Sequence, residues 1–436
     1  MIEEKITAKE INRLAVPAII AGISEPLISL ADTAIVGHLG SAELAGVGIG
    51  SGLFLLFIWT LSSMKSAISS IVAQYVGKGK VGEIQSLVPQ TIIFALLVGL
   101  GLILATIPFS GLILDFFYQA KGQVLTFSND YYNVRAWGYP FTLATFTIFG
   151  VFRGCQNTSW AMKISLIGGI INLLLDYSFV YGIWIPKPLG VEGAAYASLI
   201  AQIFMFLAGL VVLRKKFRYS YRWASKLNAE FRQLIQIFFN LLLRTVFLNV
   251  AYSLAIRYST SYGKMSIAAH TIAMNIWLFS AFFIDGYANA GNAIAGKLFG
   301  GGQQSELRRV GLQITRISVL IGALLGAVYA MLYPFIANVF TSDKGVVVIF
   351  NSIFIFVILS QPINGISFAL DGIFKGLGRA SLLRNTLFLG TFLVFVPTLL
   401  LLDYFELEMY AVWVAFSLWM IFRAFSLLYV FRRDYK

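Results

Sequence analysis

The chain has 436 residues, of which 58% are hydrophobic and 12% are charged, whereas soluble domains are about 45–50% apolar and about 25% charged. This excludes an ordinary soluble protein, and apolar runs of about 20 residues, long enough to cross a bilayer, recur throughout the sequence. The net charge of +13 does not indicate a nucleic-acid partner, because the basic residues gather at a few junctions between apolar runs. One cysteine excludes an intramolecular disulfide, and two histidines argue against a metal site built from histidine.

Twelve segments are predicted to be membrane-spanning helices, and several are longer than the minimum, which is typical of tilted helices that project past the bilayer. In chain order they are 11–37, 44–76, 86–114, 127–152, 160–183, 191–213, 230–260, 265–298, 307–339, 346–374, 381–402 and 408–431. The even number places both termini on one side, and the basic junctions make that side the cytoplasm by the positive-inside rule. The expected location is the cell inner (plasma) membrane, as a multi-pass protein with cytoplasmic termini.

The two halves of the sequence are related. HLGSAELAGVG (38–48) corresponds to SYGKMSIAAHT (261–271), and QYVGKGK (74–80) to KLFGGGQ (297–303), both at an offset of 223 residues. VFRGCQNTS (151–159) corresponds to IFKGLGRAS (373–381) at an offset of 222. The sequence therefore predicts an all-α polytopic membrane protein with its twelve helices in two pseudo-symmetric six-helix bundles. The predicted domains are an N-terminal lobe, a cytoplasmic linker and a C-terminal lobe, at 1–213, 214–229 and 230–436.

The motifs that the sequence lacks argue against an enzyme. No GxxxxGK[ST] motif is present to hold the phosphates of ATP, and no HExxH motif is present to hold zinc. No serine, histidine and aspartate are spaced so that helical geometry would bring them together. The sequence therefore favours a transporter over an enzyme.

A few polar residues lie within the apolar segments, where an ionisable group is costly and is by default a functional hypothesis. Asp32 lies near the outer end of the first helix, and Asp176 lies roughly 12 Å below the outer end of the fifth at 1.5 Å per residue. Asn172 is on the same helix face as Asp176, and Ser198 on the next helix has a similar depth. The alternative interpretation is that each acid forms a hydrogen bond between helices, or that the predicted end of its helix is misplaced and the acid is solvated.

These oxygen-bearing side chains predict an ion-coupling site. They suit a hard monovalent cation such as Na⁺, bound at Asp32, Asn172, Asp176 and Ser198, and two carboxylates in a low dielectric can alternatively carry a proton. The prediction is a transient coupling ion, Na⁺ or H⁺, with no permanent metal and no cofactor. At the repeat offsets the two acids correspond to Ala255 and Thr398, so coupling is assigned to the N-terminal lobe.

Other polar and soft side chains are candidates for a substrate cavity: Glu25, Met64 and Asp285. A structural acid satisfied by a partner is the alternative for Glu25, and packing is the alternative for Met64. Asp371 lies four residues before Lys375, and this spacing predicts a structural ion pair.

Several stretches resemble the multidrug and toxic compound extrusion (MATE) family, in particular its DinF-like branch. They are LAVPAIIAGISEPLISLADTAIVGHLG, VFRGCQNTSWAMK, GIINLLLDYSFVYG followed by GVEGAAYAS, and ALDGIFKGLGRA, and the likeness covers essentially the whole chain. The resemblance implies two six-helix bundles around a V-shaped cavity that opens alternately to the two sides. It also implies efflux of cationic or amphipathic compounds, driven by entry of sodium or protons.

Residue by residue, the resemblance places functional groups at Asp32, Asn172, Asp176 and Ser198, and it matches Tyr131 to a tyrosine that joins this network in some relatives. Threonine is common in the family at the position of Ser198, and serine retains the side-chain hydroxyl. RGCQNT (153–158) departs from the frequent RGxGDT pattern, and Asn292 stands where related sequences can carry an acid, which puts ion coupling from the second lobe in doubt.

The leading hypothesis is a secondary active efflux antiporter for organic cations, drugs and other amphipathic small molecules, acting as a monomer in the lipid bilayer. The first alternative is a lipid-linked oligosaccharide flippase, which predicts a basic cavity able to hold a pyrophosphate; Arg244 and Arg257 leave room for it. The second is a membrane-embedded enzyme, for which no nucleophile and base are evident.

Overall fold

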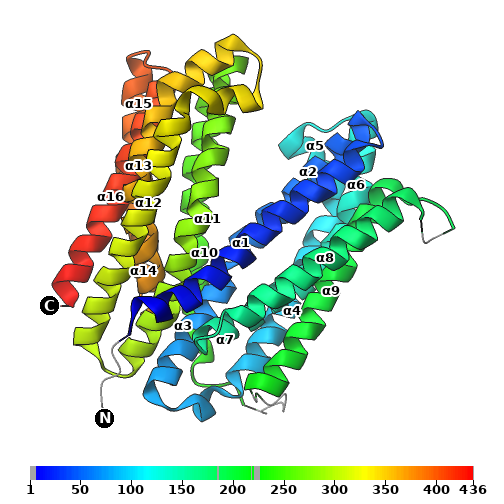
Figure 1. Cartoon of the computed structure of the whole chain (residues 1–436). Helices are drawn as coiled ribbons and strands as arrows, with labels where there is room; N and C mark the ends of the chain where they lie inside the picture. Colours follow the sequence, from blue (N-terminus) through cyan, green and yellow to red (C-terminus); the bar gives the residue numbers. More distant parts are fainter. Residues whose placement is uncertain (1–5, 184–185, 218, 220–225, 436) are drawn as a thin grey trace. The chain divides into compact units, whose positions relative to one another are not determined.

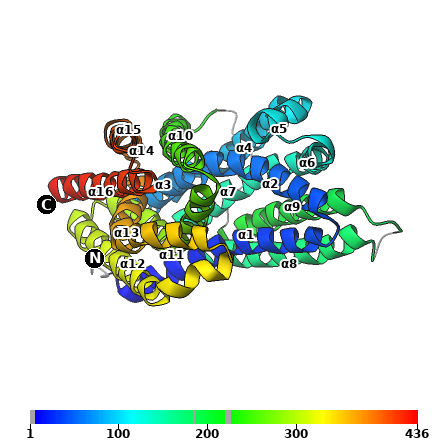
Figure 2. The same ribbon diagram turned by 90° about the horizontal axis from the view of Figure 1, so that it is seen from above.

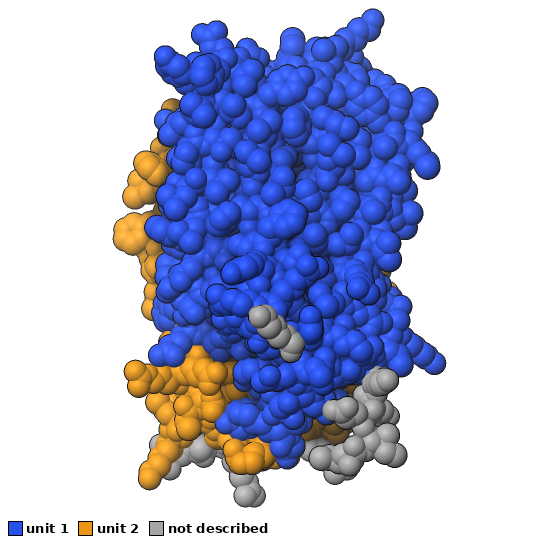
Figure 3. Space-filling model, turned by 90° about the vertical axis from the view of Figure 1, so that its left-hand side faces the viewer, with its two compact units in different colours: residues 1–19, 73–79, 236–436 blue, residues 20–72, 80–235 orange. Residues whose placement is uncertain are grey.

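The computed structural model describes residues 6–183, 186–217, 219 and 226–435, and the side chains of residues 24–32 lie outside the described part. The chain forms two compact units, coloured in Figure 3. Unit 1 comprises Met1–Ile19, Ala73–Gly79 and Gln236–Lys436, and unit 2 comprises Ile20–Val72 and Lys80–Ile235. Helices α1 (Ala8–Gly37), α3 (Ser63–Lys78) and α10 (Phe231–Ser261) therefore contribute residues to both units. The predicted lobe boundaries at residues 213 and 230 stay a prediction.

Unit 2 is built from long apolar helices that pack in pairs. Helix α8 packs against α9, α2 against α6 and α4 against α7, while α9 also contacts α6 and α7 (Figures 1 and 2). Proline interrupts two of the predicted spans, because it removes a backbone N–H from the helix: Pro108 lies between α4 and α5, and Pro140 lies at the start of α7. The helices are α2 (Ser41–Leu61), α4 (Leu87–Thr106), α5 (Ser110–Tyr118), α6 (Gly122–Arg135), α7 (Tyr139–Gly154), α8 (Ser159–Tyr181) and α9 (Gly190–Phe217).

Unit 1 is centred on α13, which packs against α11, α12 and α16 (Figure 1). An aromatic core that includes Trp277, Phe416 and Trp419 holds α11 and α16 together. A π-helical segment, Gly390–Phe395, joins α14 to α15 just before Pro397. The helices are α10 (Phe231–Ser261), α11 (Lys264–Gly300), α12 (Gln304–Phe340), α13 (Lys344–Gly376), α14 (Ala380–Leu389), α15 (Val396–Tyr404) and α16 (Met409–Asp434).

The predicted fold class is confirmed: the chain is an all-α, multi-pass membrane protein. Ten helical segments of the described chain are long and apolar enough to cross a membrane, and each corresponds to a predicted span. The other two predicted spans, 11–37 and 127–152, are helical as α1 and as the segment α6–α7. The span predicted at 44–76 is interrupted at Ser62, between α2 and α3.

Glycines at corresponding positions of the internal repeat allow close helix approaches in both units. In unit 2 a Cβ on Gly150 would lie 2.4 Å from the carbonyl oxygen of Lys65. In unit 1 a Cβ on Gly372 would lie 2.0 Å from the carbonyl oxygen of Ala288. These pairs occupy corresponding positions of the two repeats, so the repeat preserves a backbone-to-backbone approach that a side chain would prevent.

A second glycine approach joins the two copies of one repeat motif within unit 1. A Cβ on Gly77 would lie 1.9 Å from the carbonyl oxygen of Lys297, and a Cβ on Gly300 would lie 1.9 Å from that of Gln74. Gly77 corresponds to Gly300, and Gln74 to Lys297, at the offset of 223. The contact is therefore reciprocal, as a two-fold relation between the motifs requires.

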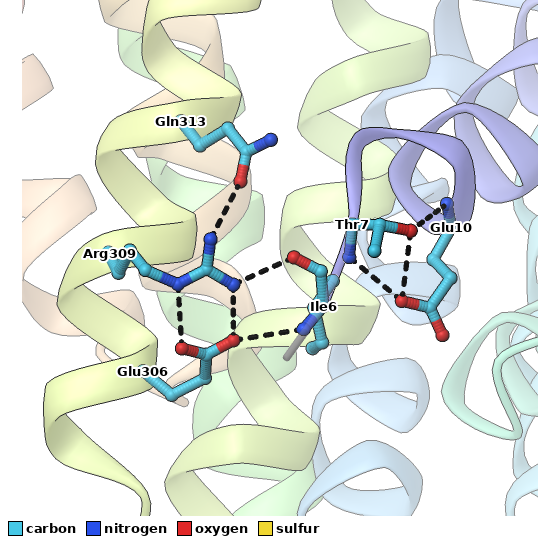
Figure 4. Close-up of polar contacts among 6 residues, drawn as sticks. All are labelled: Ile6, Thr7, Glu10, Glu306, Arg309 and Gln313. Atoms are coloured by element: carbon cyan, nitrogen blue, oxygen red, sulfur yellow. Dashed lines mark hydrogen bonds and ion pairs between the residues drawn. The ribbon is translucent and has the colours of Figure 1, made fainter. Parts of the chain in front are cut away.

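The start of α1 is capped and bound to α12 within unit 1 (Figure 4). The backbone N–H of Thr7 donates to the carboxylate of Glu10 at 2.8 Å, and the N–H of Glu10 donates to the Thr7 hydroxyl at 3.4 Å, which forms a capping box. The N–H of Ile6 donates to Glu306 at 3.0 Å, and Nη2 of Arg309 donates to the Ile6 carbonyl at 2.7 Å. These bonds fix where α1 begins on unit 1.

A buried ion cluster ties α10 to α13. Oδ1 of Asp371 accepts hydrogen bonds from Nε and Nη2 of Arg244 at 2.8 and 2.7 Å. Oδ2 of the same carboxylate lies 2.6 Å from Nζ of Lys375, so the predicted ion pair between these residues is confirmed. The Asp371 side chain is 4% exposed. One carboxylate thus compensates two cations in the interior of unit 1.

Replacing Gly372 with Ala is expected to lower the thermal unfolding temperature of the detergent-solubilised protein. The new methyl group would meet the Ala288 carbonyl oxygen at 2.0 Å and force α13 away from α11, and overpacking of this kind typically costs about 1–3 kcal/mol. Gly101→Ala is the matched control, because nothing lies within 4 Å of a Cβ at that helical position. Equal unfolding temperatures for the two variants would contradict the assignment of Gly372 as an approach point.

Asp371→Asn is expected to destabilise the protein by about 3–5 kcal/mol, because removal of one partner leaves buried cations uncompensated. Unfolding followed by intrinsic tryptophan fluorescence measures the effect. Asp434→Asn serves as the control, since this carboxylate pairs with the more exposed Arg379 and Arg433 and its loss should change stability little. A small effect at Asp371 would show that the cluster is not structural.

Candidate functional site

A cavity of about 120 Å³ lies within unit 2. Side chains from α2, α6, α7, α8 and α9 line it. Much of the wall is apolar or aromatic: Phe54, Leu55, Ile58, Phe146, Phe149 and Met205. The polar part of the wall comprises Ser51, Tyr131, Arg135, Thr142, Thr145, Ser165, Asn172, Ser198 and Gln202. The cavity therefore combines an apolar wall with many hydrogen-bonding groups.

Three of the residues predicted for ion coupling line this cavity: Tyr131, Asn172 and Ser198. All three are buried, and Nδ2 of Asn172 donates to Oγ of Ser198 at 3.4 Å. Close packing of α8 on α9 brings the last two together, because a Cβ on Gly193 would lie 2.8 Å from the backbone of Phe179. The small residues of GVEGAAYAS thus place an amide and a hydroxyl side by side.

Asp176 is fully buried in α8, one helical turn beyond Asn172. The four-residue spacing corresponds to a rise of about 6 Å along the helix. Asp176 does not belong to the cavity wall itself. The structure thus places a carboxylate in the interior of unit 2, one turn from the amide and hydroxyl pair.

The remaining predicted site residues are not brought to this cavity in the described part of the chain. The side chains of Asp32 and Glu25, both in α1, lie outside the described residues. Met64 is buried in α3 at 2% exposure and does not line the cavity. Asp285 is exposed on α11 of unit 1, where its carboxylate accepts a hydrogen bond from Asn289 at 3.3 Å. The functional roles predicted for these residues stay predictions.

Several polar cavity residues were not predicted from the sequence, among them Arg135 and Gln202. The guanidinium carbon of Arg135 lies 4.0 Å from the ring centroid of Phe54, which is a cation–π contact. Gln202 is 5% exposed and shares the neighbourhood of Arg135: both side chains come within 3.4 Å of a Cβ built on Gly138. Arg135 lies inside the predicted span 127–152, so the rule that selected Asp32 could also have selected it.

The charge on the described wall of the cavity is positive. Arg135 is the one charged residue among the described residues that line it. Nζ of Lys65 lies 5.6 and 5.9 Å from the ring centroids of Phe146 and Phe149, two aromatic residues of the wall. A second cation is therefore close to the cavity without lining it.

Comparison with known proteins gives a family match over most of the chain. The model of the MatE family matches residues 17–178 and 237–401. The chain is 27% identical to DNA damage-inducible protein F of Escherichia coli, over 98% of this chain and 93% of that protein. It is 24% identical to a probable multidrug resistance protein NorM of Thermotoga maritima, over 95% of this chain and 90% of the relative.

Solved structures share the fold. A MATE transporter of Vibrio cholerae in a bent form superposes with a TM-score of 0.89 at 18% identity, covering 98% of this chain and 96% of the other. A MOP superfamily transporter of Pyrococcus furiosus, described as having a binding pocket of reverse polarity, superposes with a TM-score of 0.88 at 21% identity and covers 98% and 95%. With the family model matched in both halves, the chain belongs to the MatE family of efflux transporters and is a membrane transporter, not an enzyme.

Proposed function

We propose that this protein is a secondary antiporter that exports small amphipathic molecules in exchange for Na⁺ or H⁺ by alternating access. The observation that carries the proposal is the cavity of unit 2, where the hydrogen-bonded pair Asn172 and Ser198 lies one helical turn from the buried Asp176. The proposed setting is the inner membrane, with both termini in the cytoplasm and a monomer as the working unit.

The coupling ion is proposed to act at Asp32 and Asp176. A carboxylate that is buried in a low dielectric is costly when charged, so either a proton on it or a sodium ion beside it relieves that cost. The amide oxygen of Asn172 and the hydroxyl of Ser198 would complete an oxygen ligand set for Na⁺. Arrival of the ion changes the charge of this region, and the change is proposed to favour the conformation that releases the substrate outside.

The wall of the cavity favours amphipathic substrates over organic cations. Its aromatic and aliphatic side chains suit an apolar body, whereas a cationic head would meet the like charge of Arg135. The same arginine is a feature that the flippase alternative predicts. However, a cavity of about 120 Å³ is small beside ordinary ligand pockets of about 300–1,000 Å³, and a lipid-linked oligosaccharide with its pyrophosphate would need far more room.

Proteoliposomes loaded with a panel of cationic, neutral and anionic aromatic probes test the coupling. A sodium gradient and a pH gradient are imposed separately, and probe release is followed for the wild type, Asp32→Asn and Asp176→Asn. We expect one gradient to drive release of at least one probe, with release reduced at least tenfold in both variants because neither can bind or give up the ion.

Asp115→Asn is the matched control, because this carboxylate is exposed on α5, and it should leave transport unchanged. The monodispersity and unfolding temperature of each variant show whether it is folded. Gradient-driven release that persists in both folded variants would contradict the proposed role of the two aspartates.

A further inference from the structure

The side chain of Arg135 is held in place on the cavity wall and has no counter-ion among the residues that the structure describes. Its guanidinium stacks on Phe54, with 4.0 Å between the guanidinium carbon and the ring centroid. Within the described part of the chain Arg135 forms no ion pair, and its buried Nη1 has no hydrogen-bond partner. A guanidinium carries five N–H donors in a planar fork and is charged; Arg135 is half-buried, and leaving its buried Nη1 without a partner is costly.

Further hydrogen-bonding atoms around Arg135 are also unsatisfied. Oγ1 of Thr142 and Oε1 of Gln202 are buried and have no partner in the described structure, and both residues line the same cavity. Gln202 is 5% exposed, so water from outside the protein hardly reaches it. Two groups that can donate a hydrogen bond, the guanidinium of Arg135 and the hydroxyl of Thr142, therefore line a cavity with no carboxylate among its described lining residues, whereas the unsatisfied atom of Gln202 is an acceptor.

The other side chains of the cavity wall indicate which kind of ligand the cavity can hold. Phe54, Phe146 and Phe149 supply aromatic faces, and Met205 supplies a soft, adaptable contact. The volume of about 120 Å³ suits a single substituted ring better than a larger drug. Donors beside an aromatic slot match a ring that bears a carboxylate or a sulfonate, since an arginine binds such planar or oxygen-rich anions with two hydrogen bonds.

We infer that the cavity of unit 2 is a binding site for small aromatic anions, in which Arg135 binds the oxyanion and the hydroxyl of Thr142 adds a hydrogen bond. The inference rests on the proposed function, because it names the substrate class of that transport site. Arg135 is thus a residue that determines specificity. Its charge favours anionic substrates, and the shape of the cavity limits their size.

The test is binding to the purified full-length protein, measured by titration calorimetry without any ion gradient. Three ligands of similar size differ in charge: benzenesulfonate is anionic at all pH values used, benzenesulfonamide is neutral, and benzyltrimethylammonium is cationic. We expect the sulfonate to bind the wild type at least tenfold more tightly than the sulfonamide, and the ammonium compound to bind more weakly than either.

Substitution of the arginine should remove this preference. We expect Arg135→Gln to bind the sulfonate at least tenfold more weakly and the sulfonamide almost as before, and Arg135→Lys to keep part of the preference because its charge remains. Arg257→Gln, which removes an exposed arginine of α10, is the control and should bind as the wild type does. If Arg135→Gln does not fold, the order of the three ligands on the wild type still decides the question.

The two proposals fail in different ways. Binding of the ammonium compound in preference to the sulfonate, or equal binding of all three ligands, would overturn the anion site even if gradient-driven export of a cationic probe is observed. Conversely, tight and Arg135-dependent binding of the sulfonate supports the anion site even if no gradient moves it across proteoliposomes, and in that case the antiport proposal is the one that fails.

Discussion

The structure depends on one constraint, which is that every backbone polar group inside a bilayer must find its hydrogen-bond partner within the protein. The chain meets it with helices, and these helices can pack closely only where side chains are small enough. Gly150 and Gly372 bring neighbouring helices together at corresponding positions of the two repeats, with the facing carbonyl oxygens 2.4 and 2.0 Å from where a Cβ would lie. These approaches set how closely the neighbouring helices pack in each half.

The charges of the Asp371 cluster and of Arg135 are handled differently. In unit 1 Asp371 lies between Arg244 and Lys375, so its carboxylate and the two cations stabilise one another. In unit 2 Arg135 rests on the face of Phe54 and has no carboxylate beside it among the described residues of the cavity wall. A cation that is left without a counter-ion in a cavity is well placed to receive one from a substrate, whereas a compensated cluster serves the fold.

Much of the fold could be predicted from the sequence, because hydrophobic length and repeated glycines are local signals. The predicted spans agree with the helices to within a few residues, and the four-residue spacing of Asp371 and Lys375 was enough to predict their ion pair. The break at Ser62 and the π-helical segment Gly390–Phe395 were not predicted, since hydrophobic length alone does not show where a long apolar run leaves regular α-helix.

The site could be predicted only in part, because the sequence does not show which helix faces meet. Sequence gives the depth of a residue along its helix, and the depth correctly grouped Asn172 with Ser198, which are hydrogen-bonded in the structure. It does not show which faces of α6 and α9 turn toward a common cavity, so Arg135 and Gln202 were not selected. Arg135 lies within the predicted span 127–152 but was not among the candidate residues. The part played by Asp32 still rests on its sequence and on its place in α1.

The central claim is that substrate and ion exchange through the same transporter in opposite directions, and reciprocal flux tests it most directly. Wild-type proteoliposomes contain either a pH-sensitive or a sodium-sensitive dye, carry no imposed ion gradient, and receive an excess of a transported aromatic compound on one side. Obligatory exchange predicts that the substrate gradient alone drives H⁺ or Na⁺ in the opposite direction, in a fixed ratio to the substrate moved. Substrate movement with no accompanying movement of either ion would contradict antiport and show a uniporter instead.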